Sequence, residues 1–71
     1  DQQLFEKLRE MRRALAKERG VPPFVILGDR SLREIARLRP RSMTMLREVY
    51  GIGERKLADF GTTILNIVSC V

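Results

Sequence analysis

The sequence predicts an all-α fold, one domain over residues 1–71 built as a compact bundle of about five short helices. Three observations lead to this fold class. Seventy-one residues suffice for a single domain with a thin core. Aliphatic side chains supply most of the apolar content, with three Phe, one Tyr and no Trp, which suits a helical bundle better than a β-sandwich. Apolar residues also recur at helical spacing between glycine and proline breaks.

Residues 3–19 form the clearest predicted helix. Its apolar face consists of Leu4, Leu8, Met11 and Leu15. Three bases spaced four residues apart follow the opposite side: Arg9, Arg13 and Lys17. Arg12 lies nearer the boundary of the apolar face. Gly20 is expected to end the helix, because the two prolines after Val21 cannot continue it.

The apolar segment 24–27 follows these prolines. A strand of four residues would have no partner here, so we expect an extended or one-turn plug packed into the core. Two interpretations of Phe24 remain open. Its ring is either part of the core plug or an exposed platform on which a base can stack.

Two short helices are predicted next. Ser31 and Glu34 have the spacing of a capping box, and the helix after it has an apolar stripe before Pro40 stops it. The members of that stripe are Leu32, Ile35, Ala36 and Leu38. Ser42 can cap the second helix, in which Met43, Leu46 and Val49 face inward, with Met45 as a further candidate, and which Gly51 ends.

The last helix is expected beyond the turn 51–53. One of its faces carries Leu57, Phe60, Gly61, Ile64, Ile67 and Val68. Gly61 within that face predicts a close approach to a neighbouring helix. We expect Cys70, near the end of the helix, to be a small buried hydrophobe.

The residue types exclude most chemistry. The chain has no His and one Cys, and its acids are scattered singly, so we expect no catalytic residues, no metal site and no cofactor. The Gly51-x-Gly53 spacing lacks the remaining parts of a nucleotide-binding Walker loop. With no apolar run long enough for a membrane span and no signal peptide, an intracellular location is expected.

Charge and glycine placement favour a polyanionic partner. The net charge is +5, and 11 of the 14 bases are Arg, which binds phosphate bidentately, although a small domain also needs net charge for solubility. Residues 49–56 resemble a helix-hairpin-helix turn that opens at a helix N-terminus beside Arg55 and Lys56. Alternatively, the glycines only permit a tight turn. Tyr50 is not required in the core and can stack on an unpaired base.

Taken together, these motifs resemble the HRDC family, the helicase-and-RNase-D C-terminal domain of RecQ-type DNA helicases and RNase D-type exonucleases. The resemblance covers nearly the whole chain. It consists of Leu4-Phe5-x-x-Leu8-Arg9-x-x-Arg12 with Ala16, Val21-Pro22-Pro23-Phe24-Val25-Ile26, Asp29-x-x-Leu32, Pro40, Leu46-x-x-Val49-x-Gly51-Ile52-Gly53-x-x-Lys56 and Phe60-Gly61.

This resemblance implies a five-helix bundle without activity of its own and an auxiliary role in binding single-stranded or unusual DNA structures. In bacterial RecQ-type members, an aromatic residue after the Pro-Pro pair is associated with single-strand binding. Phe24 occupies that position. A Phe in place of the commoner Tyr preserves stacking and loses a hydroxyl group.

The sequence therefore predicts a monomeric module that tethers single-stranded or branched DNA, with RNA as a possible ligand, beside its parent helicase core. The expected phosphate-binding residues are Arg9, Arg13, Lys17, Arg55 and Lys56, and the expected stacking residues are Phe24 and Tyr50. Two other functions remain open. The chain is alternatively a docking module for its own enzyme or another protein, or the auxiliary domain of an RNase D-like ribonuclease.

Overall fold

Helix α1 (Gln2–Arg19) begins one residue before the predicted start and ends at Arg19 as the sequence predicts. The Asp1 carboxylate accepts a hydrogen bond from the Leu4 backbone N–H at 3.1 Å and so caps the first turn. Gly20 ends the helix with a φ of 66°, a left-handed conformation that glycine adopts without steric cost. Leu4, Leu8 and Met11 are buried, which confirms the predicted apolar face.

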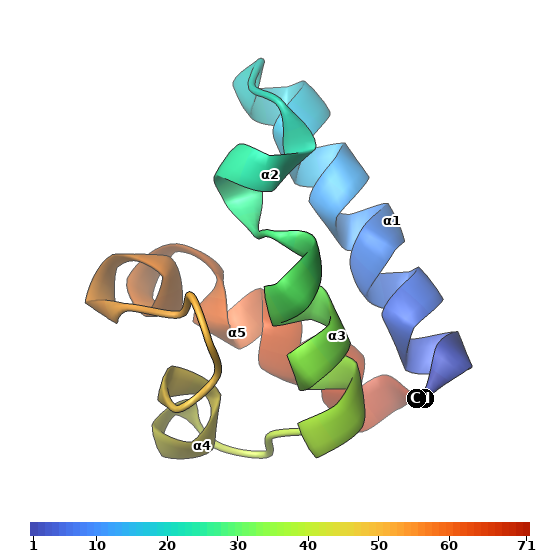
Figure 1. Cartoon of the computed structure of the whole chain (residues 1–71). Coiled ribbons are helices and arrows are strands. Elements are labelled where there is room, and N and C mark those ends of the chain that lie inside the picture. The colour runs from blue at the N-terminus through green and yellow to red at the C-terminus, as the bar shows by residue number, and fades with distance from the viewer.

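The computed structural model describes residues 1–71 and contains four further helices and no strand (Figure 1). Their bounds are α2 (Pro23–Ile26), α3 (Asp29–Leu38), α4 (Met43–Arg47) and α5 (Glu54–Cys70). The all-α prediction with about five helices is confirmed. The segment after the Pro-Pro pair is a single helical turn, one of the two conformations expected for it.

One hydrophobic core of 15 buried residues joins these helices. Helix α1 packs against α2, α3 and α5. Helix α4 packs mainly against α5. Figure 1 shows α1 and α3 side by side, with α5 behind α3 and the two chain ends close together. Arg39 links these ends, because its guanidinium donates to the Asp1 carboxylate and, at 2.6 Å, to the Val71 carbonyl.

The predicted capping box at Ser31 and Glu34 is wrong. Helix α3 starts three residues earlier than predicted, at Asp29 with Gly28 as its N-cap, so Ser31 lies inside the helix and is buried. Its hydroxyl donates to the Tyr50 carbonyl at 2.6 Å, and Glu34 accepts from the Tyr50 backbone N–H at 3.3 Å. Both side chains therefore bind the backbone of Tyr50 instead of capping their own helix.

The prediction for α4 holds in part. Leu46 and Val49 are buried, but Met45 is 49% exposed, because a helix of five residues turns only one side chain fully into the core. Met43 is also partly exposed and lies over Gly61 of α5. A Cβ atom on Gly61 would lie 2.8 Å from the Met43 sulfur, which confirms the predicted close approach.

Two apolar residues predicted to face the core are exposed. Leu38 lies in the last turn of α3, where no neighbouring helix covers that side. Cys70 is the last residue of α5 and points away from the bundle, so the prediction of a buried cysteine is wrong.

Arg12 connects three helices through one guanidinium. Its Nη1 atom donates to the Leu27 carbonyl at 2.9 Å and to the Asp29 carboxylate at 2.8 Å, and its side chain is only 13% exposed. The hydrogen bond and the charge of Arg12 lower the pKa of Asp29 below its ordinary value. Arg12 thus fixes the chain between α2 and α3 against α1.

This ion pair predicts a specific pH dependence of stability. Because the folded pKa of Asp29 is lowered, its stabilisation is present above the ordinary value of about 3.9 and is lost as pH falls through the folded pKa. Asp29→Asn should therefore lower the Tm at pH 7, and the difference from the native chain should shrink as pH falls below about 4. Thermal denaturation followed by circular dichroism measures both.

Asp59→Asn is the matched control, because Asp59 is an exposed acid without an ion pair. If Asp29→Asn and the native chain differ equally at pH 7 and pH 3, the carboxylate does not stabilise the fold through its charge.

Candidate nucleic-acid interface

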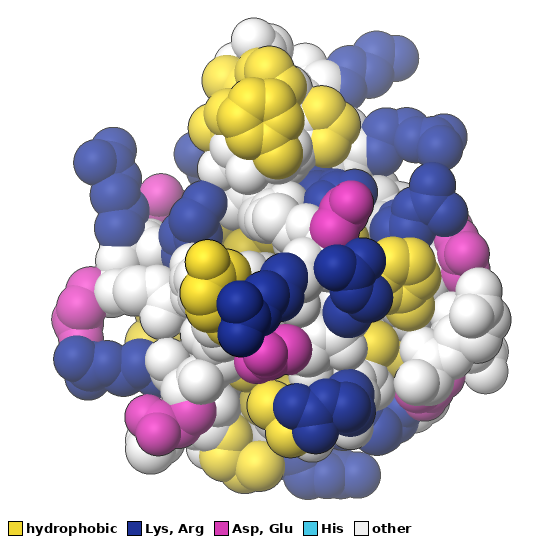
Figure 2. All heavy atoms as spheres, viewed as in Figure 1, with side chains coloured by type: hydrophobic (Ala, Val, Ile, Leu, Met, Phe, Trp, Pro, Cys, Tyr) yellow, Lys and Arg dark blue, Asp and Glu magenta, His cyan; other side chains and the backbone are white.

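Helix α2 presents an apolar surface to solvent. Phe24 is 71% exposed and Val25 is 46% exposed, whereas Ile26 and Leu27 are buried. Residues in a helix are spaced about 100° around its axis, so a single turn cannot point all four side chains at the core. The core-plug interpretation is therefore correct for Ile26 and Leu27 and wrong for Phe24. Figure 2 shows apolar side chains gathered over α2, with Lys and Arg side chains beside them.

A hollow of about 210 Å³ adjoins α2 on the side of α1. We call it the arginine hollow, and it is lined by Arg9, Arg12, Arg13 and Pro23. Arg9 pairs with the exposed Glu6 at 3.2 Å and Arg12 with Asp29, whereas Arg13 has no ion pair. The hollow thus offers the uncompensated charge of Arg13 to an anion.

Lys17, which was predicted on the same face, lies outside this hollow. It is exposed and makes no hydrogen bond or ion pair, so it extends the positive surface along α1 without being part of a built cavity. The helical phasing of Arg9 and Arg13 is confirmed by their shared cavity.

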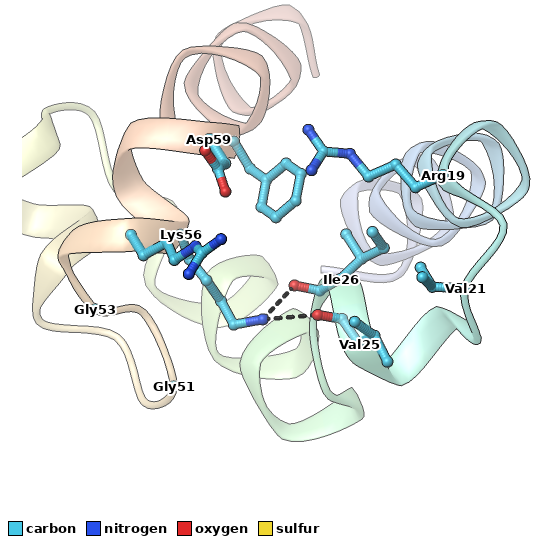
Figure 3. A pocket seen from close by; sticks show the side chains of 10 residues that line it. Arg19, Val21, Val25, Ile26, Gly51, Gly53, Lys56 and Asp59 are labelled. Carbon is cyan, nitrogen blue, oxygen red and sulfur yellow. Dashed lines mark hydrogen bonds between the residues drawn. The ribbon is translucent and has the colours of Figure 1, made fainter.

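A larger hollow of about 690 Å³ lies on the other side of α2, between α2 and the start of α5 (Figure 3). We call it the α2–α5 groove. Its apolar walls come from Val21, Val25, Ile26 and Phe60, and its charged side chains are Arg19, Arg55, Lys56 and Asp59. Arg19 lies over the Phe60 ring, with its guanidinium carbon 4.9 Å from the ring centre.

Lys56 connects the groove to α2. Its ammonium donates to the Val25 carbonyl at 2.9 Å and to the Ile26 carbonyl at 2.8 Å (Figure 3). These carbonyls lie at the C-terminal end of α2, where a helix lacks its own hydrogen-bond donors. Lys56 therefore holds α2 in place. The neighbouring Arg55 is exposed to solvent.

Tyr50 lies apart from both hollows, on the turn between α4 and α5. Its ring is 55% exposed, which confirms that the core does not require it, but one face is covered by Arg30 with the guanidinium carbon 3.9 Å from the ring centre. The structure thus brings Arg9 and Arg13 to one side of α2 and Arg55 and Lys56 to the other, whereas Phe24 lines neither hollow.

Sequence reasoning missed Arg12, Arg19 and Val25 as members of this surface. Arg19 precedes the Gly20 break, and its position over the groove depends on the chain reversing after Gly20. No periodicity in the sequence reports that reversal. The placement of Arg12 at the boundary of the apolar face was the available signal for its half-buried position.

A substitution at Gly51 tests the turn that carries Tyr50 and lines the α2–α5 groove. Its φ is 80°, and an added Cβ atom would lie 2.5 Å from the Ser31 hydroxyl. Gly51→Ala should lower the free energy of unfolding by about 1–3 kcal/mol, because both the strained backbone and the Ser31 hydrogen bond are affected. Urea denaturation measures this loss.

Gly53→Ser is the matched control. Gly53 is the N-cap of α5, has ordinary φ and has nothing within 4 Å of an added Cβ atom, so serine should change stability by no more than about a few tenths of a kcal/mol. Equal stabilities of the two variants would contradict the steric account of Gly51.

Lys56→Met tests the attachment of α2. Methionine keeps the apolar stem but removes the ammonium, so the free energy of unfolding should fall by about 1–2 kcal/mol. Amide exchange at Leu27, whose N–H bonds the Pro23 carbonyl, should also become faster. Lys17→Met, which removes an unattached base, is the control. If the two variants behave alike, Lys56 does not hold α2.

The structure shows no cluster of metal-binding side chains. No group of three or more His, Cys, Asp or Glu side chains gathers where it can hold an ion. None of the five helices combines the length and the apolar character that crossing a membrane requires.

Comparison with known proteins identifies the domain. The sequence model of the HRDC domain matches residues 1–68. The ATP-dependent DNA helicase RecQ of Bacillus subtilis is 41% identical over 63 residues, which cover 89% of this chain and 11% of that helicase. The ATP-dependent DNA helicase UvrD2 of Mycobacterium tuberculosis is 38% identical over 68 residues, or 96% of this chain and 10% of that helicase. This chain thus spans about a tenth of the length of these curated relatives.

A solved structure agrees with these relatives. The third HRDC domain of RecQ from D. radiodurans superposes with a TM-score of 0.90 at 39% sequence identity, covering 94% of this chain and 88% of that one. The five-helix architecture described above is therefore that of a known domain. The chain belongs to the HRDC domain family and is an HRDC domain of the RecQ type.

Proposed function

We propose that this HRDC domain is an auxiliary module that tethers single-stranded or branched DNA for a helicase of which it is a part. The observation that carries this proposal is the exposed Phe24 ring on α2, next in the chain to Pro23, which lines the arginine hollow. An aromatic face next to guanidinium groups matches one nucleotide, since bases stack on the ring and the phosphate binds the guanidinium. The named relatives are DNA helicases, which favours DNA over RNA as the ligand.

Rigidity of α2 supports this role. The turn that presents Phe24 is held by Arg12 at the Leu27 carbonyl and by Lys56 at the Val25 and Ile26 carbonyls. A ring on a fixed turn loses less conformational freedom when a base stacks on it than a ring on a mobile loop does. Exposure of Phe24 is thus built into the fold.

The proposed phosphate contacts differ in strength. Arg13 contributes most because no acid neutralises it, Arg9 shares its charge with Glu6, and Lys17 adds long-range attraction. In this proposal Lys56 acts mainly through the position of α2, and Tyr50 is a secondary stacking residue because Arg30 already covers one face of its ring. One copy of the chain carries all these residues, so the proposed unit is a monomer.

Fluorescence anisotropy with a labelled single strand of about ten nucleotides tests the proposal at several salt concentrations. Binding should saturate and weaken with salt. Phe24→Ala should weaken it about 5- to 150-fold, the equivalent of about 1–3 kcal/mol for one stacked base, with an unchanged salt slope. Arg13→Gln should weaken it and lower the slope by about 0.7.

Arg37→Gln is the control, because Arg37 is an exposed base on α3 that lines neither hollow. Since Phe24 is exposed, Phe24→Ala should keep the native Tm, and Phe24→Tyr should keep the binding. The proposal is overturned if the native chain does not bind at low salt, or if Phe24→Ala binds as tightly as Arg37→Gln. Salt-insensitive binding to the helicase core would favour the docking function instead.

A further inference from the structure

Consecutive residues of α2 face different surfaces. Pro23 lines the arginine hollow, Phe24 is the exposed crest, and Val25 lines the α2–α5 groove. This follows from the rotation of about 100° per residue around a helix axis. The two hollows are therefore neighbours across a single helical turn, with the Phe24 ring between them.

The α2–α5 groove combines an apolar wall with unneutralised bases. Val21, Val25 and Phe60 supply apolar surface, and neither Arg19 nor Arg55 forms an ion pair. These two arginines come from opposite sides, Arg19 from the end of α1 and Arg55 from the first turn of α5. A ligand with a flat apolar body and a negative charge matches this lining.

Asp59 limits which part of such a ligand lies beside it. Its carboxylate is in the groove wall, as Figure 3 shows, and would repel a phosphate placed next to it. The same oxygens accept hydrogen bonds from the N–H groups at a base edge. The charge distribution thus separates a phosphate position near the arginines from a base position nearer Asp59.

We propose that the α2–α5 groove is a second nucleotide subsite. One base of a strand stacks on Phe24, and another base of the same strand binds in the groove. This inference rests on the proposed function. A helix with its side chains is about 10–12 Å across, and a stacked strand advances about 3.4 Å along its axis per nucleotide, so a stacked strand crosses α2 in about three nucleotide steps. Arg13 then binds a phosphate on one side of the crest, and Arg19 and Arg55 each bind a further phosphate on the other side.

Nucleic acid is favoured over an acidic peptide by the continuity of this surface. The arginine hollow, the Phe24 ring and the groove follow one another without an intervening acidic side chain on α2. A repeated pattern of base-sized apolar surface beside a guanidinium matches the repeat of a polynucleotide. A peptide ligand would need only one of these hollows.

The double variant Arg19→Gln/Arg55→Gln tests the subsite in the full 71-residue chain. Both side chains are exposed and neither forms an ion pair, so the variant should stay folded, and the loss of the contact between Arg19 and the Phe60 ring should lower the Tm only slightly. With the single strand of about ten nucleotides used above, binding should weaken and the salt slope should fall by about 1.4, twice the value for one lost phosphate contact. In nuclear magnetic resonance titrations of the native chain, the amides of Val21, Val25 and Phe60 should shift together with that of Phe24.

The outcomes separate this inference from the proposed function. If the native chain does not bind, or if Phe24→Ala has no effect, both fail. If Phe24→Ala weakens binding but the double variant behaves like Arg37→Gln and the groove amides do not shift, only the second subsite is overturned. Groove amides that shift with an acidic aromatic peptide and not with the oligonucleotide would also overturn it, in favour of a protein ligand.

Discussion

The candidate nucleic-acid interface depends on how a helix of four residues is held in place. Such a helix cannot stabilise itself, since forming the first turn fixes several residues for very few hydrogen bonds. Here the three carbonyls at its C-terminal end, those of Val25, Ile26 and Leu27, accept hydrogen bonds from Lys56 and Arg12. These positive charges also lie where a helix end is electronegative. Because α1 and α5 supply the donors, the position of Phe24 is determined by the bundle as a whole.

This arrangement divides the bases of the chain into two groups. One group is engaged within the protein: Arg12, Arg30, Arg39, Arg47 and Lys56 bind carboxylates, carbonyls or the Tyr50 ring. The other group forms no ion pair and includes Arg13, Lys17, Arg19 and Arg55, of which Arg19 also lies over the Phe60 ring. Only the second group can neutralise phosphates at no cost to the fold. In the proposed role, phosphate binding therefore depends more on the positions of these four residues than on the net charge of +5.

Local rules were sufficient for much of the fold. The period of apolar residues predicts α1 and α5, and Gly20, Gly51 and Gly61 lie where a chain reversal or close approach requires glycine. The same rules failed at Ser31, whose hydroxyl binds a residue 19 positions away instead of capping its own helix. They left Phe24 undecided and failed for Cys70, because hydrophobicity does not say which side of a one-turn helix or of a helix end is covered. Tertiary placement decided all three.

The candidate surface was predictable only in part for the same reason. Helical phasing brought Arg9 and Arg13 together, and the family resemblance pointed to Phe24, but Arg19 and Val25 join the surface only after the chain has reversed. In the proposed role, a surface of two nucleotide-sized hollows on a chain of 71 residues binds weakly when alone. Weak binding is adequate beside other DNA-binding sites, because a linked second site acts at an effective concentration of about millimolar. In the function proposed above, a module that makes up about a tenth of its relatives' length would contribute by slowing the release of a strand that the rest of a helicase already holds.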